Sequence, residues 1–177
     1  MDFKNEKSRI IIRTGNNEDI IELQMCANEF IEFIDDFEIN LHNEKYFILA
    51  AYYCKNLSGI LLAENFISKI NGLETLIPKI QLIFLFVNST YRNKGIASLL
   101  LKNFIKIQKK EKIGSIYINL PQKYKFGKKF LEKFNFVQIK VANNKIVLER
   151  KLWYDFGIES CDFSKHRKQI NLNNNII

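Results

Sequence analysis

The segment from Gln81 to Leu101 most constrains how this chain can fold, because a turn joins two different hydrophobic patterns there. Residues Leu82 to Val87 are apolar, aromatic and β-branched, which predicts a buried strand. From Ile96 onward the apolar residues recur at helical spacing, which predicts a helix. The turn between them includes the residues Arg92-Asn93-Lys94-Gly95-Ile96-Ala97. The sequence therefore predicts a strand that passes through a polar turn directly into a helix.

This turn has the chemistry of an anion site. The first turn of a helix presents N–H groups without intrahelical partners and the positive end of the helix dipole. Gly95 would let an anion approach the main chain without a Cβ in the way. We therefore expect a diphosphate cradle formed by the main chain of Arg92 through Ala97. A P-loop would need G-x-x-x-x-G-K-S/T and a dinucleotide fingerprint would need three glycines, and this segment has neither.

The length and composition indicate one compact domain without a membrane span. With 177 residues and 47% hydrophobic content, the chain can build one ordinary core. We place the domain at residues 8–152 and expect residues 153–177 to form a partly disordered extension, because its end is charged and Asn-rich. No signal region and no apolar run of roughly 18 residues is present, which predicts a soluble, cytoplasmic protein without membrane contact. The three cysteines, Cys26, Cys54 and Cys161, lack metal-type spacing, so we expect no metal site.

The net charge of +8 favours an anionic ligand, and the basic residues become denser after position 102. RNA would also be attracted to such a surface. However, the chain carries no nucleic-acid-binding motif, and its lysines are not interleaved with aromatic residues. We favour a solvated lysine surface and do not expect nucleic acid as a partner.

Strand and helix patterns alternate along the chain, which predicts an α/β (α+β) layered sheet. The first helix is expected to begin at Glu18, with acidic residues in its first turn. The last two strands are expected to meet at a turn at Asn143-Asn144. Strands are predicted near residues 8–13, 46–53, 59–63, 79–87, 113–120, 136–141 and 146–151, and a short helix over 127–134 with Phe126, Phe130 and Phe134 on one face.

Several segments together resemble the GNAT superfamily of acetyl-CoA-dependent N-acetyltransferases. The turn Arg92 to Ala97 matches the family signature R/Q-x-x-G-x-G/A, and Val87-Asn88-Ser89-Thr90-Tyr91 resembles its V-x-P-x-Y lead-in without the proline. The segment Phe130 to Phe136 resembles the family's F-Y-E-K-L-G-F, and the order of elements from about Ile10 to Leu152 is also similar. The resemblance implies a mixed, mostly antiparallel sheet flanked by helices, splayed between the strand before the cradle and the next strand.

The resemblance also implies a role for each matching position, with acetyl-CoA as the cosubstrate. The cradle would bind the CoA diphosphate through main-chain N–H groups, with optional charge from Arg92 and Lys94. The pantetheine arm would lie in the splay, and one N–H there would polarise the thioester carbonyl. The implied cofactor-binding residues are Leu85, Phe86, Val87, Arg92, Asn93, Lys94, Gly95, Ile96, Ala97 and Ser98.

The catalytic half of the site departs from the family pattern. The family's frequent tyrosine acid corresponds to Leu131, and a glutamate that some members use as a base corresponds to Gln81. The family's common asparagine falls at about Tyr124. The implied reaction is direct attack of a primary amine on the thioester, and a thiol with a pKa near ~8.5 can leave as thiolate unaided. We expect Tyr124 as the replacement catalytic acid and Tyr117 as the second choice, with a packing role as the alternative for Tyr124.

The acceptor is expected to be a cationic amine, on a small molecule or a protein, because acidic residues gather in the region that would set substrate choice. A solvated helix face is the alternative reading of those residues. Two other functions remain open: a catalytically impaired acyl-CoA-binding regulatory module and an RNA-directed acetyltransferase. Aromatic residues from Trp153 onward would cap the core or form a homodimer contact. The acidic residues are Glu29, Glu32, Asp35, Asp36, Glu38 and Glu44, and the two histidines, His42 and His166, are isolated.

Overall fold

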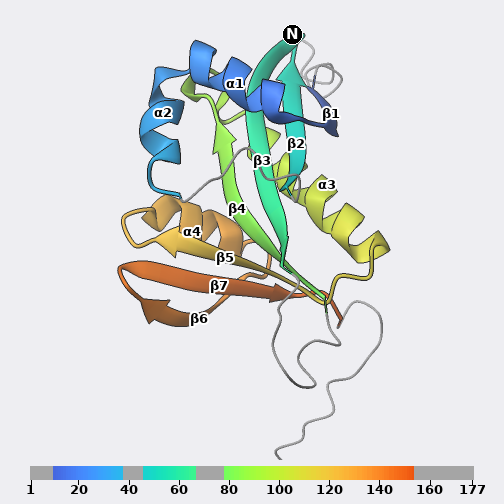
Figure 1. Ribbon diagram of the computed structural model, residues 1–177, viewed down its shortest axis with the longest axis vertical. Coiled ribbons are helices and arrows are strands. Elements are labelled where there is room, and N and C mark those ends of the chain that lie inside the picture. Colours follow the sequence, from blue (N-terminus) through green and yellow to red (C-terminus); the bar gives the residue numbers. More distant parts are fainter. Residues whose placement is uncertain (1–9, 38–45, 67–77, 154–177) are drawn as a thin grey trace, which may run out of the picture.

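The computed structural model describes residues 10–37, 46–66 and 78–153, which form one sheet of seven strands with helices on both faces (Figure 1). The strands are β1 (Ile10–Thr14), β2 (Tyr46–Tyr53), β3 (Asn56–Phe66), β4 (Lys79–Val87), β5 (Ser115–Pro121), β6 (Val137–Ala142) and β7 (Lys145–Lys151). The α-helices are α1 (Asn17–Cys26), α2 (Asn28–Ile34), α3 (Ile96–Lys110) and α4 (Lys125–Glu132). The strand order is β1-β2-β3-β4-β5-β7-β6.

The sheet is antiparallel except between β4 and β5, and this parallel pair is short. Its ladder contains only three residue pairs and ends at Gln81 and Tyr117. Beyond this point the two strands separate, and Figure 1 shows β4 and β5 running apart from their shared end. The predicted mixed, mostly antiparallel sheet with a splay after the fourth strand is therefore confirmed.

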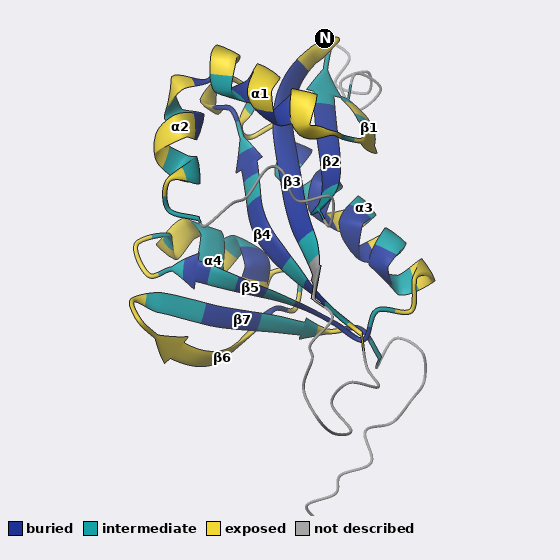
Figure 2. Cartoon of the chain, in the orientation of Figure 1, coloured by how far each residue is buried: buried dark blue, intermediate teal, exposed yellow. Residues whose placement is uncertain are grey.

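The core consists of two layers, one on each face of the sheet. The helices α1 and α2 bury Ile20, Leu23 and Phe30 against one face of β2, β3 and β4. The helices α3 and α4 bury their apolar residues, including Phe104 and Leu131, against the opposite face. Figure 2 shows the three central strands almost continuously buried between these layers. Central strands covered on both faces account for the long apolar runs in the sequence.

A β-bulge reverses the alternation of side chains partway along β4. Leu82 packs under α3, whereas both Ile83 and Phe84 pack against the layer of α1 and α2. The register between β3 and β4 shifts at this point, and Ile83 is the extra residue. After the bulge, Leu85 and Val87 again lie on the α3 side. The bulge therefore sets the orientation of the last residues of β4, which lead into the cradle.

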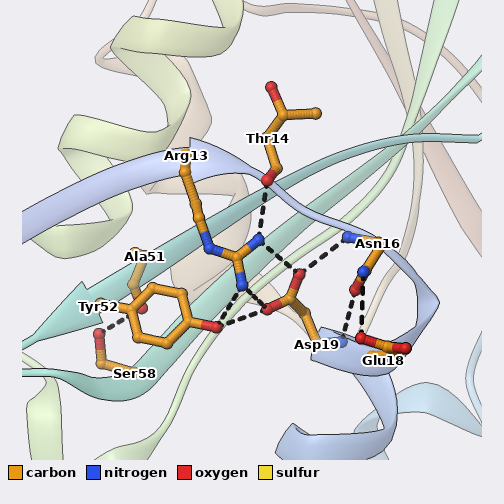
Figure 3. Close-up of polar contacts among 8 residues, drawn as sticks. All are labelled: Arg13, Thr14, Asn16, Glu18, Asp19, Ala51, Tyr52 and Ser58. Atoms are coloured by element: carbon orange, nitrogen blue, oxygen red, sulfur yellow. Dashed lines mark hydrogen bonds and ion pairs between the residues drawn. The ribbon is translucent and has the colours of Figure 1, made fainter.

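The start of α1 is held by Asp19, whose side chain is 2% exposed. Arg13 donates two hydrogen bonds to its carboxylate, at 2.7 and 3.1 Å, and the hydroxyl of Tyr52 donates a third at 2.6 Å (Figure 3). The main-chain N–H of Asn16 donates to the same carboxylate, and the Asn16 side chain accepts from the N–H of Asp19. This capping box joins the helix start to β1 and β2.

Several predicted boundaries shift in the structure. The turn between β2 and β3 consists of Cys54 and Lys55, both with positive φ, so β3 begins at Asn56 and is longer than predicted. The turn between β6 and β7 lies at Asn143 and Asn144 as predicted, again with both φ values positive. The chain reverses within two residues between β2 and β3. The residues from Asn56, which were expected to form a loop before position 59, therefore belong to β3.

The predicted aromatic stripe on α4 is wrong at one position. Phe126 is 90% exposed, whereas Phe130 and Phe134 pack against the core. The helix begins at Lys125, two residues earlier than predicted, which places Phe126 in its exposed first turn. The predictions that concern residues 154–177, His42, Glu38 and Glu44 lie outside the described residues.

Candidate active site

The cradle between β4 and α3 contains two residues with a left-handed backbone conformation. Gly95 has φ of 82° and forms the N-cap of α3, and Asn93 also has a positive φ, of 62°. A Cβ added at Gly95 would meet no protein atom within 4 Å. The N–H groups of Ile96, Ala97 and Ser98 form the first turn of the helix, where no intrahelical acceptor exists. These features fit a diphosphate bound by main-chain N–H groups at a helix N-terminus.

The two cationic side chains of the cradle are engaged with the protein itself. Arg92 forms an ion pair with Glu29 at 3.0 Å, and its Nε donates a hydrogen bond to the carbonyl of Val87 at 2.9 Å. The Nζ of Lys94 lies 4.9 Å from the ring centroid of Tyr53. Arg92 therefore braces the turn and joins it to α2, so the main chain is the part of the cradle best placed to bind an anion.

Past Gln81, where the β4–β5 ladder ends, the edge of β4 that faces β5 has no partner strand among the described residues. Asn88 donates its N–H to Ser58 on the β3 side. Since main-chain groups alternate between the two edges of a strand, Phe86 also faces β3, whereas Leu85 and Val87 direct their N–H groups toward the splay. Of the three residues predicted to bind pantetheine through the main chain, the alternation thus favours Leu85 and Val87 and disfavours Phe86.

A cavity of about 560 Å³ adjoins this edge of β4. It is bounded by one side of α2, by the end of β4 and by the start of α4. Its floor is mostly apolar, and its charged groups come from α2, the residues just after α2, the cradle and the segment before α4. The lining residues are Glu29, Glu32, Phe33, Asp36, Leu85, Phe86, Val87, Arg92, Ala97, Lys123, Tyr124, Phe126, Gly127 and Phe130.

The segment formed by α2 and the residues just after it makes polar contacts across the cavity through two carboxylates, those of Glu29 and Asp36. Glu29 accepts hydrogen bonds from Arg92 and from the main-chain N–H of Ser89, both at the cradle. Asp36, two residues after the end of α2, accepts a hydrogen bond from the hydroxyl of Tyr124 and pairs with Lys123 at 2.8 Å. These contacts lower the pKa of the Asp36 carboxyl, chiefly through the hydrogen bonds from Lys123 and Tyr124. The segment is therefore tied to both sides of the splay.

Tyr124, the predicted acid, lines the cavity, and its hydroxyl is hydrogen-bonded to Asp36. Burial raises the pKa of this phenol, and the hydrogen bond and negative charge of Asp36 raise it further. The phenol consequently stays protonated at neutral pH and is a weak proton donor. Its one hydroxyl hydrogen is donated to Asp36, so it could donate to another anion in the cavity only by giving up that bond.

The two positions that depart from the family pattern have structural roles. Leu131 is 3% exposed and belongs to the core under α3. Gln81 accepts a hydrogen bond from the hydroxyl of Tyr117 at 3.2 Å, where the β4–β5 ladder ends. Tyr117, the second candidate acid, therefore lies at the origin of the splay, and it is not among the residues that line the cavity.

The acidic residues that were expected in the region that sets substrate choice line the cavity in part. Of the six acidic residues predicted there, Glu29, Glu32 and Asp36 line the cavity and Asp35 does not. The sequence analysis did not identify Phe33 and Lys123 as lining residues. The spacing of Glu29, Glu32 and Asp36 by three and four positions is a helical pattern that could have separated them from Asp35.

A sequence model described as the acetyltransferase (GNAT) family matches residues 17–136. The chain belongs to this family. Family membership makes it an acetyl-CoA-dependent N-acetyltransferase, with acetyl-CoA as the cosubstrate. A comparison with curated protein sequences found no match.

Solved structures of other GNAT enzymes share the fold at low sequence identity. A PaiA N-acetyltransferase from Thermoplasma acidophilum in complex with coenzyme A is 20% identical, with a TM-score of 0.63 over 80% of this chain and 98% of that one. Arabidopsis thaliana Naa50 in complex with the bisubstrate analogue CoA-Ac-MVNAL is 16% identical, with a TM-score of 0.61 over 81% and 99%. An aminoglycoside acetyltransferase from an uncultured soil metagenomic sample, in complex with sisomicin, is 13% identical, with a TM-score of 0.61 over 77% and 95%.

The described residues also bear on metal sites and membrane-spanning helices. In the ranges 10–37, 46–66 and 78–153, no group of three or more His, Cys, Asp or Glu residues could hold a metal ion. Within the same ranges, every helix is too short or too polar to cross a membrane.

Proposed function

We propose that this GNAT enzyme transfers the acetyl group of acetyl-CoA to a cationic primary amine bound in the cavity beneath α2. One observation carries the proposal: a single cavity is lined both by the open edge of β4 and by three carboxylates on or just after α2. The first would hold the thioester and the second would attract the amine. The cradle residues Arg92 through Ser98 would hold the diphosphate through their main chain, as the resemblance implies.

The N–H groups of Leu85 and Val87 are the proposed donors to the pantetheine arm and to the thioester carbonyl. A fixed main-chain donor at the carbonyl oxygen stabilises the negative charge that develops when an amine attacks. The ammonium loses one proton before attack and the nitrogen loses a second after it, and CoA leaves as the thiolate. Tyr124 is proposed to exchange its hydrogen bond to Asp36 for one to that thiolate. Its raised pKa makes complete proton transfer unfavourable, so we expect its effect on rate to be moderate.

The charge of the cavity supports a cationic acceptor. Glu29 is neutralised by Arg92 and Asp36 by Lys123, which leaves the carboxylate of Glu32 uncompensated among the charges that line the cavity. The aromatic residues Phe33 and Phe130 would contact the apolar part of the acceptor. The structural neighbours contain a peptide-based bisubstrate analogue and an aminoglycoside, so amines of very different size bind to this fold.

A thiol-release assay with a panel of amines tests this function. The panel contains spermidine, the aminoglycoside sisomicin, a peptide with a free N-terminus and an N-terminally blocked peptide with one lysine. We expect acetylation of at least one of them, confirmed by mass spectrometry, and a higher KM for it at high salt. Measurable CoA binding without turnover of any amine would refute the enzyme proposal and favour a regulatory acyl-CoA-binding module.

A further inference from the structure

The cavity contains a primary amine that belongs to the chain itself. Lys123 lies between β5 and α4, and its Nζ is 2.8 Å from an Oδ of Asp36. The same Nζ is 5.4 Å from the ring centroid of Tyr124. The Lys123 side chain is 63% exposed, so it is free to move on its flexible four-carbon stem. Lys123 thus places a primary amine, the functional group of the proposed acceptor, in the cavity where the acceptor is proposed to bind.

A chain of ring contacts joins Lys123 to the open edge of β4. The ring of Tyr124 is 5.6 Å from that of Phe33, and Phe33 is 5.2 Å from Phe86. Phe86 lies between Leu85 and Val87, whose N–H groups face the splay. Lys123 and the proposed thioester-binding edge therefore line the same cavity, and the flexible stem of Lys123 can carry its amine through this cavity toward the thioester.

We propose that Lys123 is an internal acceptor and that the enzyme acetylates it in cis. This inference rests on the proposed function. The ammonium of Lys123 first loses a proton to solvent, as any amine acceptor must. The neutral Nζ attacks the thioester carbonyl carbon, the C–N bond forms, the C–S bond breaks, and CoA leaves as the thiolate. The second proton on nitrogen is lost to solvent, and the products are Nζ-acetyllysine and CoA.

The modification changes the charge of the acceptor cavity. An acetylated lysine is neutral, so its ion pair with Asp36 is lost, whereas the hydrogen bond from Tyr124 to Asp36 can persist. Before modification two cations, Arg92 and Lys123, balance two of the three carboxylates that line the cavity. After modification only Arg92 of these two cations remains to balance the three carboxylates. Self-acetylation therefore removes a competing ammonium and strengthens the attraction for a cationic acceptor.

Neighbouring lysines provide matched controls. Lys125 is exposed in the first turn of α4 and does not line the cavity. Lys128 donates a hydrogen bond to Gln138 and also lies outside the lining. Both are close to Lys123 in sequence, so general chemical acetylation of surface lysines by acetyl-CoA would label all three. Catalysed acetylation would select Lys123, because only its amine is held in the cavity.

The test is incubation of the full chain with acetyl-CoA and no added amine, followed by intact-mass measurement and peptide mapping over time. We expect one acetyl group on Lys123, at least about tenfold faster than on Lys125 or Lys128, because proximity raises the rate. Gly95→Glu, which should not bind CoA, provides the chemical background. Lys123→Arg should remove this fast acetylation. In the wild type, the rate constant of Lys123 acetylation should not depend on protein concentration. Equal rates of acetylation at Lys123 and Lys125 would overturn the proposal. So would acetylation of Lys123 in Gly95→Glu at the wild-type rate.

The same experiment separates this inference from the proposed function. If the wild type acetylates an amine of the panel while Lys123 stays unmodified, self-acetylation is refuted and the proposed function stands. If CoA binds but neither Lys123 nor any amine is acetylated, both are refuted. If an active wild-type chain labels Lys123 of added Gly95→Glu chain as fast as its own, transfer occurs between molecules and the cis mechanism is wrong.

Discussion

Gln81 and Tyr117 form the last residue pair of the β4–β5 ladder, and the hydroxyl of Tyr117 donates a hydrogen bond to Gln81 at that point. Burial, and secondarily the negative charge of Glu64, raises the pKa of Tyr117 to about 12. The hydroxyl is therefore protonated at neutral pH and joins the two strands where they begin to separate. The position at which the splay opens is thus fixed by side chains as well as by main-chain pairing.

Tyr117→Phe should loosen this junction. Loss of one partly buried hydrogen bond should lower the free energy of unfolding by about 1 kcal/mol, because the Gln81 oxygen loses its donor. We also expect weaker CoA binding, because the strands would separate at a less defined point. Urea unfolding and calorimetric titration with CoA measure the two effects. Tyr53→Phe, on β2, is the control, and an equal loss of CoA affinity in both variants would contradict the role of Tyr117.

Gly95 should be required for CoA binding more than for folding. Gly95→Ala places a Cβ at φ of 82°, which costs roughly 1–2 kcal/mol of stability, but it meets no protein atom. Gly95→Glu adds a carboxylate at the cradle, where a diphosphate would be repelled, and should lower CoA affinity by more than about a hundredfold. Circular dichroism and calorimetric titration separate the two effects. Wild-type CoA affinity in a folded Gly95→Glu chain would refute the cradle assignment.

Tyr124→Phe should reduce the rate without abolishing it. The phenol is a weak acid here because its pKa is raised, and a thiolate leaves without help near neutral pH. We expect kcat to fall by about tenfold to a hundredfold, at or below the lower limit of about a hundredfold that is typical of general acid–base assistance. Asp36→Asn keeps the phenol but replaces its charged acceptor, and it should change kcat less. A KM effect without a kcat effect in Tyr124→Phe would show that the residue only shapes the cavity.

Glu32→Gln should weaken binding of a cationic acceptor. The carboxylate of Glu32 lines the cavity, whereas that of the nearby Asp35 does not. Removal of an exposed charge near an ammonium is worth up to about 1 kcal/mol, so KM for the acceptor should rise by about two- to fivefold. Asp35→Asn removes the same charge three residues away and is the matched control. Equal KM values in the two variants would show that general surface charge, and not Glu32, attracts the acceptor.

Local sequence patterns were sufficient to predict the strand–turn–helix unit around Gly95 and the succession of strands and helices along the chain, because both depend on residues that are neighbours in the chain. The turn at Gly95 and the paired asparagines at 143 and 144 are examples, since their positive φ values follow from residue type. The bulge at Ile83 was not predictable, because Ile83 and its neighbours are equally apolar and only pairing with β3 reveals the extra residue.

The acceptor side of the site was also beyond sequence patterns. Arg92 and Glu29 are separated by 63 residues and Tyr124 and Asp36 by 88, so only the folded sheet brings them together. Alternation along β4 likewise could not distinguish the edge that faces β3 from the edge that faces the splay. The sequence therefore predicted individual residues for the cofactor half of the site, and only an acidic region for the acceptor half.

Asp19 should be among the most important polar residues for stability, because its buried carboxylate holds Arg13, Tyr52 and the start of α1 together. We expect Asp19→Ala to lower the free energy of unfolding by about 3 kcal/mol, measured by urea unfolding at pH 7. Glu18→Gln, on the exposed side of the same turn, should change it by less than about 0.5 kcal/mol. An effect of Asp19→Ala no larger than that of Glu18→Gln would contradict the role of the network.

The same network should make stability depend on alkaline pH through Tyr52. Burial, and then the hydrogen bond to Asp19, raises the pKa of Tyr52 to about 12 from an ordinary value near ~10. Because the folded chain favours the protonated phenol, its contribution is complete below about pH 10 and is lost as the pH rises toward 12. The stability difference between wild type and Tyr52→Phe, measured by urea unfolding across this range, should therefore shrink with increasing pH. A constant difference would show that the Tyr52 hydroxyl is not held by Asp19.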